Sequence, residues 1–176
     1  MPIVPFAALP DDARVWVFAA SSAVGGARAG RLLAAVDGWL SQWSAHGEPL
    51  TCARDWRNDH FLAIGVDQSA AGASGCSVDA LFRVLQQQQG AIGTSLVGGA
   101  RIFFRDPAGA IQCVDRDAFA RLLSVGAVGD ATPGFDTTIT SLTAYRSAFE
   151  RPCAESWHRD LALPAASSAS QPIIVR

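Results

Sequence analysis

The sequence predicts an α+β fold, in which a mostly antiparallel sheet carries helices packed on one face. Segments rich in β-branched and aromatic residues alternate with segments of helical periodicity, in the order strand, helix, strand, strand, helix, strand, strand, helix, helix. Two of the strand pairs are separated only by a short turn, which suits antiparallel neighbours. With 176 residues, 49% of them hydrophobic and 17% charged, the chain is apolar enough to fill one core. A split β-α-β core is one arrangement that fits the first hundred residues.

The first strand and helix are predicted from composition and spacing. Residues 14–19 are β-branched and aromatic and predict a buried strand. Helical spacing then predicts an amphipathic helix over residues 29–45, from Leu32, Val36, Trp39, Leu40 and Trp43. Gly47 and Pro49 are typical of the end of a helix, and His46 is then a histidine at its C-terminus. We expect Trp16, Trp39, Trp43 and Trp56 to lie in the core.

A hairpin and a second helix follow. Residues 50–56 and 61–66 predict two strands, and Arg57-Asn58-Asp59 between them has turn chemistry. A loop of small residues leads into a helix that reaches about Gln89, predicted from the apolar residues Val78, Leu81, Phe82 and Leu85.

The second half predicts shorter elements around strong turn signals. In order, these are a hairpin of residues 101–105 and 111–114, a short helix capped by Asp115, a loop over 126–134, a helix over 137–149 and a last helix over 152–163. We therefore expect a single domain over residues 1–163. Residues 164–176 are rich in Pro, Ala and Ser and predict a flexible C-terminal tail.

The composition of the chain argues against several classes of function. All 14 basic residues are arginine, so the chain has no lysine for a Walker A motif or a Schiff base. The formal net charge of −2 argues against a general nucleic-acid or anionic-membrane binder. No membrane span or secretory signal is predicted, and the four cysteines are widely spaced, which favours free thiols in the cytoplasm. No cofactor motif is present, and no spacing supports a metal site.

The strongest candidate for a site is the loop Gly72–Asp79, with the sequence G-A-S-G-C-S-V-D. It joins the end of a strand to the start of a helix, where unpaired backbone N–H groups carry positive partial charge. Those groups favour a bound anion and would lower the pKa of a thiol. The sequence therefore predicts a ligand site formed by Ser74, Gly75, Cys76, Ser77 and Asp79.

Three interpretations of this loop remain open. In the first, Cys76 or Ser77 is only the N-cap, and Asp79 in the first turn complements the helix dipole. In the second, the protein is a binding module for a partner protein or for a small anion held by this loop. In the third, it is a cysteine-dependent enzyme for acyl or thiol chemistry, with Cys76 as nucleophile. The enzyme would need His46 or His158 as base and Asp67 as orienting carboxylate. His158, beside Trp157, is equally typical of a side chain that docks the chain end onto the core.

The chain also resembles a family of small bacterial proteins, on the runs Leu9-Pro10, Ala13–Val17, His46-Gly47, Asn58–Asp67, Ala73–Asp79 and Glu155–Arg159. The family is frequent in Bacteroidetes-type genomes, and its members are often labelled ABC transporter ATPases. The resemblance spans roughly residues 8–163 and implies one folded unit, but no mechanism. ATP hydrolysis is not expected, because the chain lacks a G-x-x-x-x-G-K-[ST] motif.

Overall fold

The computed structural model describes residues 3–69, 72–97 and 101–161, and within them the chain is α+β, as predicted. The expected tail over 164–176 lies outside these residues. Two four-stranded antiparallel sheets and one two-stranded sheet make up the strands. The first sheet and its helices consist of β1 (Arg14–Ala20), α1 (Gly26–Leu40), β4 (Cys52–Arg57), β5 (Phe61–Val66), α2 (Gly75–Ile92) and β6 (Leu96–Val97).

The first sheet has the strand order β4-β5-β1-β6 with antiparallel neighbours throughout. The crossover through α1 joins β1 to β4, and β5 lies between these two strands. The crossover through α2 joins β5 to β6, with β1 between them. Two interleaved split β-α-β units are therefore present, as the sequence suggested for the first hundred residues. Asn58 and Asp59, both with positive φ (54° and 55°), close the predicted β4–β5 hairpin.

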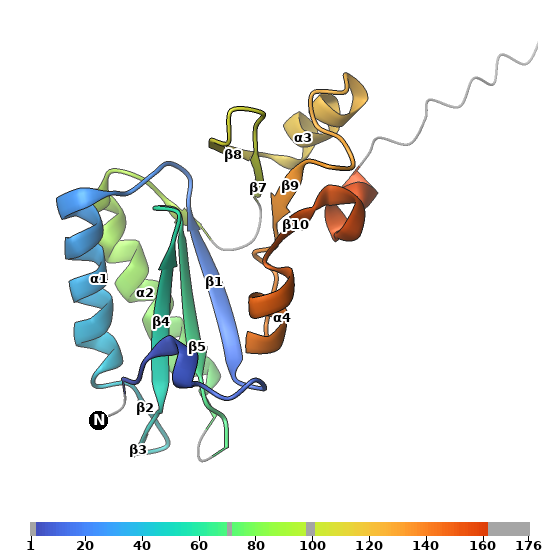
Figure 1. Cartoon of the computed structure of the whole chain (residues 1–176). Coiled ribbons are helices and arrows are strands. Elements are labelled where there is room, and N and C mark those ends of the chain that lie inside the picture. The colour runs from blue at the N-terminus through green and yellow to red at the C-terminus, as the bar shows by residue number, and fades with distance from the viewer. Residues whose placement is uncertain (1–2, 70–71, 98–100, 162–176) are drawn as a thin grey trace, which may run out of the picture.

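Helices α1 and α2 cover one face of this sheet (Figure 1). Leu32, Val36 and Leu40 of α1 are fully buried against it, and so is Leu81 of α2. Helix α1 ends at Leu40, five residues before the predicted end. The helical pattern runs on to Trp43 because that side chain packs on the same core from a turn, in which the Trp43 N–H donates to the Leu40 carbonyl.

The segment after α1 is a small hairpin and not a helix end. Strands β2 (Ser44–Ala45) and β3 (Glu48–Pro49) pair around His46 and Gly47, both with positive φ. The prediction of His46 as a C-terminal helix residue is therefore wrong. The turn needs two left-handed residues, and Gly47 provides one of them at no steric cost.

The opposite face of the first sheet carries the short helix α4 (Leu142–Ala148) and the second sheet (Figure 1). Phe61 of β5 is the centre of this contact. Its ring lies 4.6–5.3 Å, centroid to centroid, from the rings of Phe103, Phe135 and Phe149. Helices thus lie on both faces of the first sheet, which corrects the expectation of one covered face.

The second sheet has the order β10-β9-β7-β8, formed by β7 (Ile102–Arg105), β8 (Ile111–Val114), β9 (Pro133–Phe135) and β10 (Glu150–Pro152). The β7–β8 hairpin and helix α3 (Arg116–Ser124) with its Asp115 cap are where the sequence predicted them. Three other predictions are wrong. Strand β9 lies partly in the loop that was expected over 126–134. The helix predicted over 137–149 is shorter and is α4 alone. In place of the last helix, predicted over 152–163, β10 is followed by two 3-10 turns, η2 (Cys153–Glu155) and η3 (Trp157–Leu161).

Candidate functional site

The predicted ligand loop lies at the start of α2, and its capping residue is Ser74. The Ser77 N–H donates to Ser74 Oγ at 3.3 Å, and Ser77 Oγ donates back to the Ser74 carbonyl at 2.9 Å. Neither Cys76 nor Ser77 is the N-cap, and Asp79 falls outside the first turn of the helix. Ser74 takes the cap because its own backbone is extended (φ −79°, ψ 158°) while Gly75 is already helical.

Cys76 is the second residue of α2, and its side chain is exposed. The other three cysteines are shielded: Cys52 and Cys153 are buried, and Cys113 is half-buried. Burial raises the pKa of the Cys52 thiol to about 11 and also raises the pKa of Cys113 and of Cys153. Cys76 is therefore the most accessible thiol of the four.

Among the described residues, the structure shows no hydrogen bond between Cys76 and the three residues that the enzyme hypothesis groups with it. His46 is exposed in the β2–β3 turn, at the same end of the first sheet as the start of α2 (Figure 1). Asp67 accepts the Ser69 N–H at 2.8 Å, which lowers the pKa of its carboxyl and engages it in its own loop. His158 is fully buried among residues of the second sheet and η3. The described part of the chain therefore shows no paired base for Cys76.

A pocket of about 250 Å³ lies between the end of α1 and the start of α2. Trp39 comes from the last turn of α1, and Ser77 and Ala80 come from the first turns of α2. The remaining lining residues are Gln42, Trp43 and Ser44, from the turn after α1 and the first residue of β2. The predicted ligand loop therefore does border a cavity, through Ser77.

Two tryptophans give this pocket an aromatic wall. The ring centroids of Trp39 and Trp43 are 4.9 Å apart with the planes tilted by 42°, and Trp16 packs behind Trp43 at 6.1 Å. Both side chains were predicted to lie in the core, because they continue the apolar face of the helix. Their spacing of four residues was the available signal, since it puts two indoles together at one end of a helix.

Trp43 also holds an unsatisfied donor. Its side chain is only 3% exposed, and its Nε1–H is buried with no hydrogen-bond partner in the described structure. A buried unpaired N–H of this kind costs about 1–3 kcal/mol. An acceptor atom supplied by a ligand would remove that cost. Trp56 has the same unpartnered Nε1 but does not line this pocket.

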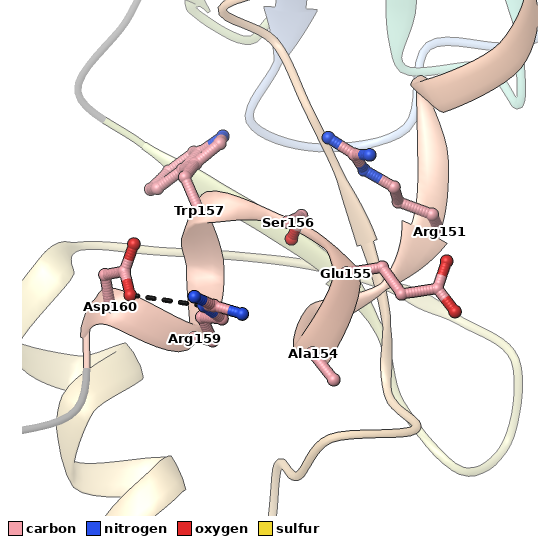
Figure 2. A pocket seen from close by; sticks show the side chains of 7 residues that line it. All are labelled: Arg151, Ala154, Glu155, Ser156, Trp157, Arg159 and Asp160. Carbon is pink, nitrogen blue, oxygen red and sulfur yellow. Dashed lines mark hydrogen bonds and ion pairs between the residues drawn. The ribbon is translucent and has the colours of Figure 1, made fainter.

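A larger hollow of about 380 Å³ lies on the C-terminal turns and is drawn in Figure 2. Its lining includes the charged side chains Arg151, Glu155, Arg159 and Asp160. Arg159 and Asp160 pair with each other at 3.4 Å. In Figure 2 the Arg151 guanidinium and the Glu155 carboxylate point in different directions. The charges do not converge on one point.

Ser156 and His158 beside this hollow resemble a catalytic pair, but their contacts are structural. Ser156 Oγ lies 2.6 Å from His158 Nδ1 and also donates to the Cys153 carbonyl at 3.3 Å. The His158 ring packs on the backbone of Gly134, and the residue does not line the hollow. Burial is the main cause of the lowered pKa of His158. Ser156 Oγ and His158 Nδ1 are thus engaged with each other, whereas His158 Nε2 and Arg151 Nε are buried without a hydrogen-bond partner among the described residues.

Comparisons with known proteins add nothing to this geometry. No family model, curated protein or solved structure matches the chain. The resemblance noted from the sequence therefore stays a prediction. In the described residues, no three His, Cys, Asp or Glu side chains are grouped to hold a metal ion, and no helix has the length and apolarity that crossing a membrane needs.

Proposed function

We propose that the protein is a binding module for a small anionic ligand with a flat apolar part, bound between the end of α1 and the start of α2. The single observation that carries this proposal is that Trp43, whose Nε1–H is buried without a partner, lines a pocket that borders the first turn of α2. Buried N–H groups normally have a hydrogen-bond partner, so this donor favours a ligand that brings an acceptor oxygen to it.

The rest of the pocket supports the same ligand class. The positive end of the α2 dipole favours negative charge near Ser77, and the Gly75 and Cys76 N–H groups have no backbone acceptor in the described part of the chain. The indoles of Trp39 and Trp43 offer apolar area to a planar group. Ser44 and Gln42 add polar groups at the rim. The volume suits a single ring with one anionic group and is small for a nucleotide.

Four unpaired thiols support the expectation that this binding takes place in a reducing, cytoplasmic compartment. All four cysteines lie within the described residues.

The test is a ligand-observed ³¹P NMR titration with phenyl phosphate, and with inorganic phosphate as a second probe. Phenyl phosphate should bind more tightly, because only it contacts the indoles. Trp43→Phe keeps an aromatic ring and removes the N–H, so it should weaken phenyl phosphate binding about tenfold, the effect of one hydrogen bond to a charged group.

Trp56→Phe is the matched control, because it removes an equally buried and unpartnered Nε1–H outside the pocket. It should leave the affinity unchanged. The proposal is wrong if the wild-type protein binds neither probe, or if both variants bind phenyl phosphate as the wild type does.

A further inference from the structure

Strand β4 is the end strand of the first sheet, and its outer edge is largely unpaired (Figure 1). On its inner side β4 pairs with β5 in an unbroken register. The Cys52 carbonyl points to the outer side, where it accepts the Val4 N–H at 3.0 Å. Because the side alternates along a strand, the backbone groups of Arg54 and Trp56 point outward too. Neither residue has a backbone hydrogen-bond partner on that side among the described residues.

The N-terminal segment covers only the start of this edge. Ile3 forms a parallel bridge with Cys52, so the residues after Ile3 run alongside β4 in the direction of its outward-facing positions. At Pro5 the chain enters the 3-10 turn η1 (Phe6–Ala8). The first ring of this turn lies 5.6 Å from the ring of Tyr145 in α4. The segment thus leaves the edge for a face of the sheet, and it does so within described residues.

The side chains of β4 bring charges of both signs to this edge. Asp55 and Arg57 lie on the face that carries α4, where Arg57 Nε donates to Asp55 Oδ2 at 2.6 Å and Tyr145 donates to the same oxygen at 3.1 Å. Both charged side chains stay accessible, with 27% of Asp55 and 41% of Arg57 exposed. Trp56, between them, lies on the opposite face and packs on the core under α1 and α2.

These charges select one way of pairing the edge with a second copy of the chain. In an antiparallel pair related by a two-fold axis, the residue on the axis lies opposite its own copy. An axis at Arg54, Asp55 or Arg57 would set like charges directly opposite each other, which destabilises a sheet. An axis nearer the start of β4 is blocked by the N-terminal segment. An axis at Trp56 sets Asp55 opposite Arg57 of the second copy, and by symmetry it does so twice.

We propose that the protein forms a symmetric dimer through the outer edge of β4, with Trp56 opposite Trp56 of the second copy. The two residues exchange two backbone hydrogen bonds, and their indoles form a cross-strand aromatic pair. The two first sheets join into one sheet of eight antiparallel strands. Because the pairing is short, the dimer is weak and forms at roughly 10 µM to 1 mM protein.

Charge reversal followed by mixing tests this pairing. Sedimentation velocity of the full-length wild type, over the same range of roughly 10 µM to 1 mM, should approach twice the mass of the chain. Asp55→Arg and Arg57→Asp should each weaken dimerisation at least about tenfold, since each sets like charges opposite each other twice. An equimolar mixture of the two variants should dimerise again, because each pair across the edge is then Asp with Arg. Glu48→Arg, which reverses an exposed charge outside β4, should behave as the wild type does.

A second measurement needs no variant. In the wild type, amide hydrogen exchange at Trp56 should slow as the protein concentration rises, because its N–H gains an acceptor in the dimer. A wild type that stays monomeric, or exchange at Trp56 that does not depend on concentration, would overturn the proposal. A dimer that either single variant retains would also overturn it, because another register or surface would then hold the two copies. The β4 edge is separate from the Trp43 pocket, so these results leave the proposed function to its own test.

Discussion

The imidazole of His158 lies against the backbone of Gly134, where an added Cβ would stand 3.0 Å from His158 Cε1 and 3.1 Å from Nδ1. Gly134 is buried in β9, and His158 is fully buried in η3. This contact seats the C-terminal turns on the second sheet. It also explains a glycine in the middle of a strand, where the close approach of another group is a common reason.

Gly134→Ala should destabilise the protein by about 1–3 kcal/mol, the usual cost of overpacking a filled core. Urea denaturation would measure the loss. Gly129→Ala is the control, since a Cβ there meets nothing within 4 Å, and it should change the free energy of unfolding by less than about 0.5 kcal/mol. In a His158→Ala background Gly134→Ala should cost much less; an unchanged cost there would show that His158 is not the cause.

His158 should make the stability of the protein depend on pH. Its pKa is lowered in the folded protein from the ordinary 6.5, first by burial and then by Arg151, with Asp136 acting in the opposite direction. The unfolded chain therefore binds more protons below about pH 6.5, and the free energy of unfolding falls as the pH is lowered from there toward the folded pKa. Above that range the stability from this group is complete.

The measurement is urea denaturation at pH 7.5 and at pH 5.5. His158→Gln should lose part of the difference in unfolding free energy between the two conditions. His46→Gln, at an exposed position, should keep it. A difference that both variants retain in full would exclude His158 as its source.

The cap of α2 can be assigned by mutation. Ser74→Ala should cost about 1 kcal/mol, because it removes the acceptor of the Ser77 N–H. Ser77→Ala leaves that acceptor in place and should cost clearly less. Thermal unfolding followed by circular dichroism would rank the two variants. The reverse order would restore the sequence-based prediction that Ser77 is the cap.

Cys76 should be alkylated before the other three cysteines. It is exposed, whereas the remaining thiols are buried or half-buried with raised pKa values. Iodoacetamide treatment of the native protein at several pH values, read by mass spectrometry, would give the four rates. Fast reaction well below pH 8 would favour the nucleophile hypothesis. Slower reaction of Cys76 than of Cys113 would contradict the exposed position of Cys76.

The elements of the first sheet could be predicted because each carries a strong local pattern. Helices α1 and α2 are long and periodic, and the β4–β5 turn has residues that tolerate positive φ. The three-residue strands β9 and β10 are too short for alternation to show. These strands lie next to a cluster in which Phe135 and Phe149 contact Phe61. Phe61 is far from both in the sequence, so no local pattern predicts the contact.

The candidate site could be predicted only in part. The small-residue loop before α2 marked a helix start, but Ser74, Cys76 and Ser77 are all able to cap, and backbone geometry decides among them. The aromatic wall could not be foreseen, because Trp43 fits the helical pattern equally well as a core residue. Its isolated N–H follows from the end of α1 at Leu40, which turns Trp43 into the pocket lining.

The most direct measurement of the central claim is the indole N–H resonance of Trp43 in ¹H–¹⁵N NMR spectra, assigned with Trp43→Phe. Saturating phenyl phosphate should shift this resonance downfield as the N–H gains an acceptor. The Trp56 resonance, from an equally buried and unpartnered N–H away from the pocket, should stay in place. A Trp43 resonance that does not move, or one that moves only together with Trp56, would contradict a ligand site between α1 and α2.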